Sequence, residues 1–144
     1  MDVQLKVCRD PLFAESLTKT NMASYYQTRG IIWDHNQFLN SWEELDNYEV
    51  YLDKTRVGVL RFSYSGGTTF LRDLQILPEF QGRGIGSKSL DLVVEHALNC
   101  QSHKLALRVF SENPAINLYE FKGFVRTSEV KGLVEMEIPL SLST

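Results

Sequence analysis

Cysteine is scarce in this chain, and so are long hydrophobic runs. The two cysteines, Cys8 and Cys100, lie far apart and form no C-x-x-C pair, so we expect two reduced thiols rather than a disulfide. No apolar run approaches the roughly 20 residues that span a membrane. The first residues, M-D-V-Q-L-K-V-C, also lack the apolar segment of a secretory signal. These absences predict a cytoplasmic protein with no membrane partner.

Positive charge is not in excess either. The chain carries 15 Lys and Arg residues against 18 Asp and Glu residues, which gives a formal net charge of −3 at pH 7. Domains that bind nucleic acids usually present a basic surface. The charge balance therefore predicts no nucleic-acid partner, and it suits cationic or neutral molecules slightly better than anionic ones.

Apolar residues, in contrast, are present throughout the chain. Hydrophobic residues make up 43% of the 144 residues, and aromatic residues make up 11%. Leu, Ile, Val and Phe are spread along the whole length, and the sequence shows no repeat, linker or low-complexity tract. This composition and length predict one domain, residues 1–144, with a substantial core.

Capping residues and apolar spacing predict four helices. Asp10 and Pro11 open the first helix, which runs to about residue 27, because Asp is a favoured N-cap and Pro suits the first helical position. Asp34 opens a short second helix in the same way. Two further helices follow from helical spacing and a closing glycine, over residues 84–99 and 114–121.

Alternating patterns and turn residues predict seven strands around these helices. The expected strands cover residues 3–8, 48–52, 57–64, 69–77, 105–110, 124–130 and 133–138. The order β-α-α-β-β-β-α-β-α-β-β favours an α+β domain. We therefore expect a central, mixed but mostly antiparallel sheet of six or seven strands, flanked by about four helices.

Three glycines fall within residues 82–86, between the fourth predicted strand and the third helix. The first N–H groups of a helix have no partners inside it, and the helix dipole makes that end partly positive. A glycine-rich lead-in lets backbone amides approach a bound oxyanion without obstruction from Cβ atoms. Arg83 adds a positive charge, and Gln81 and Ser87 add side-chain donors. This stretch predicts a cradle for a diphosphate; the alternative is a turn with nothing bound.

Two familiar phosphate-binding patterns do not fit these residues. The nucleotide P-loop, G-x-x-x-x-G-K-[ST], fails because Lys88 follows Ser87 rather than a glycine. The dinucleotide pattern, G-x-G-x-x-G, needs its third glycine at position 87 or 89, and Ser87 and Ser89 stand there. The element order also lacks the βαβαβ alternation of a doubly wound fold.

The pattern that does fit is Q-x-x-G-x-G, formed by residues 81–86. It resembles the acetyl-CoA signature of the GNAT superfamily of N-acetyltransferases. A second stretch, N-P-A-I-N-L-Y-E-F-K-G-F from residue 113 to 124, resembles the GNAT segment that carries an asparagine, a tyrosine and then Gly-Phe. The likeness covers nearly the whole chain in element order, is specific from about residue 70 to 125, and implies a GNAT-like fold.

The resemblance implies where coenzyme A binds. In the family, the diphosphate rests on amides of the glycine loop, and the pantetheine arm pairs with the backbone of the preceding strand, which splays from the next strand. The strand positions here are Ile76 and Leu77. Asn113 matches the asparagine that bonds the arm. The loop positions are Gln81, Gly82, Arg83, Gly84, Gly86 and Ser87.

The resemblance also gives Tyr119 a catalytic role, because it matches the tyrosine that points at the CoA sulfur. A neutral amine would attack the thioester carbonyl, and a backbone N–H near Leu77 would stabilise the oxyanion. The thiolate would then leave and take a proton from the phenol. The alternatives are structural: Tyr119 as packing at a helix end, and Asn113 as an N-cap ahead of Pro114, which is compatible with ligand binding.

One position departs from the family pattern. Many members place a carboxylate in the middle of the strand before the glycine loop to help deprotonate the amine, and the alignment puts Phe70 there. Other groups that could act as a base or as a relay through water are Asp73, Glu79, Glu44 and His35. Each of these also fits a surface or capping role, so no base is assigned.

The acceptor in such folds approaches from the side built by the first two helices and the last strands. The first two predicted helices and the segment between them carry aromatic side chains and carboxylates, which suit a protonated amine. Tyr26, Trp33 and Asp34 are the candidates for this site. Phe38 and Trp42 share one helix face at a spacing more typical of core residues, and Asp34 also fits an N-cap.

The sequence thus predicts an acetyl-CoA-dependent N-acetyltransferase that moves an acetyl group directly to a primary amine of a small molecule, a peptide or a protein. Direct transfer is expected because no cysteine lies near the motifs to carry the acyl group, and no metal is expected. Two alternatives stay open: a CoA-binding module of the same fold without turnover, and an acyltransferase that uses a longer acyl-CoA. By analogy with the fold, we expect a monomer or a homodimer.

Overall fold

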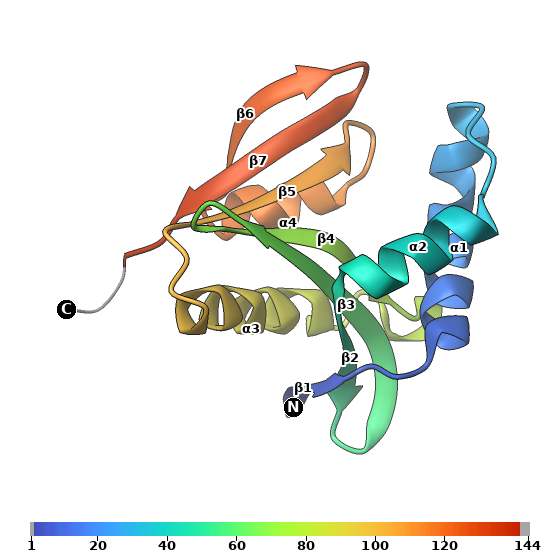
Figure 1. Cartoon of the computed structure of the whole chain (residues 1–144), viewed down its shortest axis with the longest axis horizontal. Coiled ribbons are helices and arrows are strands. Elements are labelled where there is room, and N and C mark those ends of the chain that lie inside the picture. Colours follow the sequence, from blue (N-terminus) through green and yellow to red (C-terminus); the bar gives the residue numbers. More distant parts are fainter. Residues whose placement is uncertain (1, 142–144) are drawn as a thin grey trace. The chain divides into compact units, whose positions relative to one another are not determined.

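The computed structural model of the chain describes residues 2–141 (Figure 1). Residues 1 and 142–144 of the predicted domain lie outside the described residues. The described helices are α1 (Pro11–Thr28), α2 (His35–Glu44), α3 (Ile85–Asn99) and α4 (Ala115–Phe121), with a 3-10 turn, η1 (Pro78–Phe80). The described strands are β1 (Val3–Val7), β2 (Asp46–Leu52), β3 (Thr55–Ser65), β4 (Thr68–Ile76), β5 (Lys104–Phe110), β6 (Val125–Val130) and β7 (Leu133–Pro139). Their order along the chain is the predicted one.

The strands form one sheet, with the order β1-β2-β3-β4-β5-β7-β6 among residues 2–141. β4 and β5 run parallel, with Thr68–Leu71 opposite Lys104–Leu107. β1 pairs with β2, β2 with β3, β5 with β7 and β6 with β7 in antiparallel fashion. The sheet is therefore mixed but mostly antiparallel, and the predicted α+β class is confirmed.

Side-chain caps begin the first two helices where the sequence predicts them. Oδ1 of Asp10 accepts a hydrogen bond from the backbone N–H of Phe13 at 3.1 Å, and Pro11 is the first helical residue. Oδ1 of Asp34 accepts from the backbone N–H of Gln37 at 3.0 Å. Each carboxylate satisfies one of the N–H groups that a helix start leaves without a partner, which fixes both boundaries.

The turns between strands explain small shifts of strand ends from their predicted places. The expected turn at residues 53–56 is shorter in the structure, because Asp53 adopts a positive φ of 54° and β3 already begins at Thr55. Gly66 and Gly67, with φ of 57° and 78°, reverse the chain between β3 and β4. Asp tolerates the left-handed region better than most residues do, so a tight turn forms there without glycine.

The chain divides into two compact units. The first comprises Met1–Phe62 and Asp73–Ser89, and the second comprises Ser63–Arg72 and Leu90–Thr144. The first unit has a core of buried apolar residues with partly buried hydrophobic residues packed against it; the core members are Ala14, Leu17, Phe38 and Val59, and the packed ones are Phe13, Trp33, Trp42 and Leu77. The prediction that Phe38 and Trp42 are more typical of a core is confirmed.

In the second unit, β5 and β7 lie side by side (Figure 1) and bury apolar side chains. The buried residues on these two strands include Leu105, Leu107, Val109, Val134 and Met136. Strand alternation places them on one face, opposite a face that carries charged residues. No helix within residues 2–141 is long and apolar enough to cross a membrane.

Candidate functional site

The glycine stretch forms a turn that leads from η1 into α3. Gly82 and Gly84 adopt positive φ values of 74° and 80°, which residues with a side chain rarely take. A Cβ added at Gly82 would meet no heavy atom within 4 Å, so the space beside this backbone is open. This turn, residues 81–84, is called the glycine turn below.

The start of α3 presents backbone amides next to the glycine turn. The N–H of Lys88 donates to the carbonyl oxygen of Gly84 at 3.1 Å. The amides of Ile85, Gly86 and Ser87 precede Lys88 at the start of α3. N–H groups at a helix start have no partner inside the helix. Amides of this kind, together with the positive end of the helix dipole, suit an anion; that this start of α3 binds one stays a prediction.

Side chains hold the glycine turn to the end of β4. Nε2 of Gln81 donates to the carbonyl oxygen of Ile76 at 3.0 Å, and Nδ2 of Asn21, on α1, donates to the same oxygen at 2.9 Å. Gln81 therefore fixes the turn through its side chain, where the sequence suggested a donor for a ligand. The guanidinium of Arg83 lies over the ring of Phe80, 5.2 Å from its centroid.

The backbone beside Ile76 is packed tightly against β3. The N–H of Leu77 donates to the carbonyl oxygen of Val57 at 2.8 Å. A Cβ added at Gly58 would lie 2.4 Å from the carbonyl oxygen of Gln75, so only glycine allows this approach. Successive N–H groups of a strand point to opposite edges, so the N–H of Ile76 points away from Val57 and β3.

The candidate acceptor residues lie together in the first unit. The rings of Tyr26 and Trp33 stack with centroids 5.8 Å apart, and Trp33 also contacts Phe38. Nε1 of Trp33 donates to Oε2 of Glu15 at 2.9 Å. Burial, with a smaller contribution from a nearby carboxylate, raises the pKa of Tyr26. Asp34 caps α2, as its alternative role predicts.

A buried ion pair near these aromatic residues is absent from the sequence-based predictions. Arg61 is 3% exposed, and its guanidinium contacts Asp73 at 3.1 Å, Asn47 at 2.9 Å and Ser41 at 2.7 Å. It also lies 4.6 Å from the centroid of the Phe38 ring. The signal in the sequence is an arginine in the apolar run V-G-V-L-R-F of β3, because a buried guanidinium needs a partner.

Asp73 is one of the four residues considered as a base. Burial raises its pKa, while the charge of Arg61 and the hydrogen bonds from Gln75 and Arg61 act in the opposite direction. Another of the four, His35, contacts Glu15, with Nδ1 2.7 Å from Oε2. Glu44 and Glu79 are exposed at the end of α2 and in η1. Asp73 and His35 therefore already have carboxylate or guanidinium partners.

The two motif residues beyond the glycine turn lie in the second unit. Oδ1 of Asn113 accepts from the N–H of Ala115, the first residue of α4, at 2.9 Å, although Pro114 rather than Asn113 is the N-cap of this helix. Tyr119, on α4, is 8% exposed, and its ring packs edge-on against Phe124 at 5.9 Å between centroids. Gly123, with a φ of 103°, ends the helix between them. Within residues 2–141, no group of three or more His, Cys, Asp or Glu residues could hold a metal ion.

Comparison with known proteins identifies relatives by sequence. A thialysine N-epsilon-acetyltransferase from Mus musculus is 36% identical over 80 residues, which cover 52% of this chain and 46% of the relative. A protein of the same name from Bos taurus is 38% identical over 79 residues, with the same coverage. The chain spans about half the length of the curated relatives it matches.

Solved structures share the fold across the whole chain. The PaiA N-acetyltransferase from Thermoplasma acidophilum, solved in complex with coenzyme A, has a TM-score of 0.72 at 16% identity and covers 97% of this chain and 100% of its own. The fold is therefore GNAT-like, as predicted. A protein-family model, the acetyltransferase (GNAT) family, matches residues 14–124. Since that match spans more than half of the sequence and includes both motifs, the chain belongs to the acetyltransferase (GNAT) family.

Proposed function

We propose that this chain is an acetyl-CoA-dependent N-acetyltransferase that transfers the acetyl group directly to a primary amine. The observation that carries the proposal is the glycine turn, where Gly82 and Gly84 adopt positive φ beside the amides that begin α3. In an acetyltransferase family, that geometry fits the diphosphate of coenzyme A. We place its binding on Gln81, Gly82, Arg83, Gly84, Gly86 and Ser87.

The end of β4 holds the pantetheine arm in this proposal, through backbone atoms of Ile76 and Leu77. The N–H of Leu77 is already bonded to Val57, and the carbonyl oxygen of Ile76 already accepts from Asn21 and Gln81. The N–H of Ile76 points to the other edge of the strand, so we assign to it the bond to the oxyanion that forms on the thioester carbonyl. Asn113 bonds the arm, as the family motif implies.

Tyr119 supplies the proton in the last step. A neutral amine attacks the thioester carbon and forms a tetrahedral intermediate. The C–S bond then breaks as the nitrogen releases its extra proton to water, the thiolate leaves, and the phenol of Tyr119 protonates the sulfur and regains a proton from solvent. Burial of the ring supports this role, because a buried phenol is held in one orientation. Asp73 is given no chemical step, since its carboxylate serves as the partner of the buried Arg61.

An amine acceptor is supported by the names of the relatives. The mouse and bovine relatives are named for thialysine, an amine-bearing analogue of lysine. A spermidine N-acetyltransferase from Vibrio cholerae, solved with CoA and spermine, shares the fold with a TM-score of 0.74 at 20% identity and covers 95% of each chain. We place the acceptor amine beside Tyr26, Trp33 and Asp34, and we propose that the reaction takes place in the cytoplasm.

The first test compares thermal unfolding with acetyl-CoA, CoA, NADH and ATP, followed by a thiol-release assay across a panel of amines. A ligand at about 100 times its Kd stabilises a protein by about 2.7 kcal/mol, so we expect Tm to rise by a few degrees with both CoA species only. Thiol release with an amine would then establish transfer. CoA binding without product would favour a module without turnover, and faster reaction with succinyl-CoA would favour a longer acyl donor. No shift with either CoA species would refute the proposal.

A further inference from the structure

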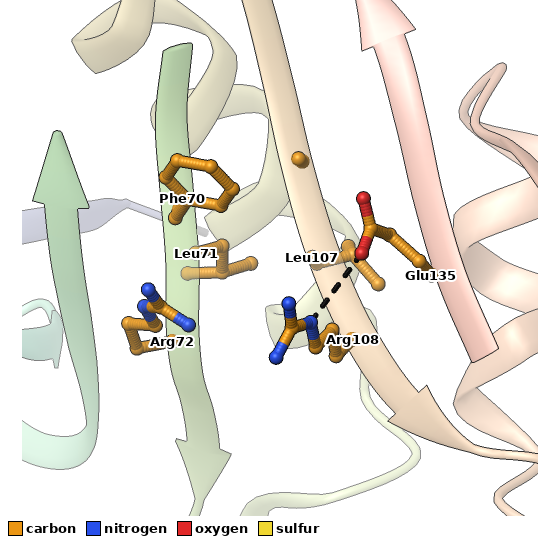
Figure 2. A pocket seen from close by; sticks show the side chains of 7 residues that line it. Phe70, Leu71, Arg72, Leu107, Arg108 and Glu135 are labelled. Atoms are coloured by element: carbon orange, nitrogen blue, oxygen red, sulfur yellow. Dashed lines mark hydrogen bonds and ion pairs between the residues drawn. The ribbon is translucent and has the colours of Figure 1, made fainter. Parts of the chain in front are cut away.

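Each unit of the chain contains an arginine paired with a carboxylate, and the two pairs differ in burial. In the second unit, Nε of Arg108 contacts Oε2 of Glu135 at 3.4 Å, in the pocket that Figure 2 shows. The Arg108 side chain is 58% exposed, and an ion pair in water contributes little to a fold. In the first unit, the side chain of Arg61 is only 3% exposed and that of Asp73 is 19% exposed. A buried pair is costly to desolvate, so the further hydrogen bonds that it makes become important.

The buried pair is the start of a chain of hydrogen bonds that reaches the end of β4. Nη1 of Arg61 donates to Oδ2 of Asp73 at 3.1 Å, and Nε2 of Gln75 donates to Oδ1 of the same carboxylate at 3.2 Å. Nδ2 of Asn21, on α1, donates to Oε1 of Gln75 at 3.2 Å and to the carbonyl oxygen of Ile76 at 2.9 Å. The chain therefore connects a buried charge to the backbone of Ile76.

The two amide side chains of this chain are each held in one orientation. An asparagine amide has two N–H donors, and the two bonds from Nδ2 of Asn21 account for both. Gln75, which is 8% exposed, accepts through Oε1 and donates through Nε2. A buried polar network whose members are satisfied is rigid. We therefore expect these side chains to fix the backbone that they contact.

That backbone includes the peptide between Gln75 and Ile76, which carries the N–H assigned above to the oxyanion. Asn21 contacts the side chain of Gln75 on one side of this peptide and the carbonyl oxygen of Ile76 on the other. A Cβ added at Gly58, on β3, would lie 2.4 Å from the carbonyl oxygen of Gln75, which belongs to the same peptide. The peptide is therefore held by hydrogen bonds on both sides and by close packing against β3.

From this geometry we infer that Asn21 and Gln75 are positioning residues for acetyl transfer, because they hold the N–H of Ile76 where the oxyanion forms. The buried pair of Arg61 and Asp73 anchors the far end of the chain of hydrogen bonds. The inference rests on the proposed function and adds to it two side chains that act through the backbone. Their effect falls on the transition state, since the negative charge that the N–H stabilises develops only there.

The test compares kcat with ligand binding in Asn21→Ala and Gln75→Met, using the amine that the wild-type chain acetylates fastest. Asn21→Ala removes both donors, and Gln75→Met removes the amide at nearly constant side-chain length. A displacement of about 1 Å can cost on the order of a hundredfold in rate, so we expect each variant to lower kcat by roughly tenfold to a hundredfold. The acceptor KM should stay within about twofold, and the rise in Tm with CoA should persist.

The double variant, Asn21→Ala with Gln75→Met, separates this role from two independent effects on the fold. Because both side chains act on one N–H group, the double variant should lose no more of kcat than the more affected single variant. Independent effects would multiply instead. Gln75→Met leaves the bond from Asn21 to Ile76 in place, so it tests the inference by itself if Asn21→Ala does not fold.

A matched control is available on α2. Asn40 is exposed, and Asn40→Ala makes the same change of residue type within a helix of the same unit. This variant should keep the wild-type kcat. Thermal unfolding with and without CoA checks that every variant is folded at the assay temperature and still binds the cofactor.

Other results would overturn the inference, and they can be told apart. A wild-type kcat in folded Asn21→Ala and Gln75→Met would refute the positioning role and leave acetyl transfer standing. A smaller rise in Tm with CoA at unchanged kcat would show that these side chains support only cofactor binding. Losses of kcat that multiply in the double variant would refute action through a shared N–H. Transfer by the wild-type chain to no amine at all would refute the proposed function and the inference with it.

Discussion

Tyr119 is the single side chain on which the proposed proton transfer depends. Tyr119→Phe keeps the ring that packs against Phe124 and removes only the hydroxyl group. General acid catalysis contributes typically 10²–10⁴-fold, so we expect kcat to fall by roughly a hundredfold or more. Thiol release at saturating acetyl-CoA measures this change.

Tyr51→Phe provides the control for that substitution. Tyr51 lies on β2, where Lys6 lies 4.3 Å from the centroid of its ring, and it has no part in the proposed chemistry. This variant should keep the wild-type kcat. A Tyr119→Phe variant that is folded and fully active would remove Tyr119 from the mechanism and leave it a packing residue.

Gly58 is a second position, where the addition of a single Cβ atom should lower the stability of the fold. A Cβ there would lie 2.4 Å from the carbonyl oxygen of Gln75, which belongs to the backbone and cannot move aside. We expect Gly58→Ala to destabilise the fold by about 1–3 kcal/mol, as overpacking usually does. Thermal unfolding should show a lower Tm, whereas Thr55→Ala, at an exposed position of the same strand, should shift Tm little.

Single residues also show what the sequence could and could not reveal. The caps at Asp10 and Asp34 were predictable, because a side chain that bonds an N–H group three residues later needs only local information. The pair of Arg61 and Asp73 joins residues on two strands, so it depends on how those strands are placed. The same holds for Asn21 and Ile76, which are 55 residues apart.

At the scale of elements, the open space beside the glycine turn is predicted to receive the diphosphate of CoA. Gly82→Ala introduces a methyl group into space where no heavy atom of the protein lies within 4 Å. The left-handed conformation costs a residue with a side chain roughly 1–2 kcal/mol. We expect a small fall in the Tm of the free protein and a much larger loss of CoA affinity, because the new Cβ obstructs the diphosphate.

Gly66→Ala is a matched control for this substitution. Gly66 also has a positive φ, 57°, and a Cβ there also meets nothing within 4 Å, but it lies in the turn between β3 and β4. It should lower the Tm of the free protein by a similar amount and leave the CoA-induced shift intact. Equal CoA shifts in the two variants would show that the glycine turn does not bind CoA.

Element order was more predictable from the sequence than the pairing of strands. Period and capping place each helix and strand within a few residues, because these signals are local. The position of β7 between β5 and β6 depends on pairing over distances that periodicity does not report. In the structure, every residue of β6 is exposed, which suits a strand at the edge of a sheet.

At the scale of the whole molecule, acid should weaken the fold through two carboxylates near the start of α1, those of Asp10 and Glu15. Burial raises the pKa of Glu15, but hydrogen bonds from Trp33 and His35 and nearby positive charges outweigh it, so the pKa lies below its usual 4.5. The N–H of Phe13 and the side chain of Arg56 lower the pKa of Asp10 below 3.8.

Both shifts have the same sign. A lowered pKa means that the folded state favours the charged form, so this stability is present above pH 4.5 and is lost as the pH falls through the folded pKa values. We expect Tm to fall between about pH 5 and pH 3, and we expect Glu15→Gln to flatten that fall. Glu129→Gln, on the exposed strand β6, should leave the profile unchanged; a profile that Glu15→Gln does not alter would contradict this account.

The carbonyl oxygen of Ile76 has a consequence for how the two ligands affect each other's binding. One oxygen accepts a hydrogen from α1, through Asn21, and another from the glycine turn, through Gln81. α1 also carries Tyr26, so a ligand that moves this helix alters a bond that the glycine turn shares. Thermodynamic linkage makes such an influence reciprocal: the factor by which coenzyme A changes affinity for the acceptor equals the factor by which the acceptor changes affinity for coenzyme A. Because two amides converge on this single atom, we expect the affinities for coenzyme A and for the acceptor to be coupled.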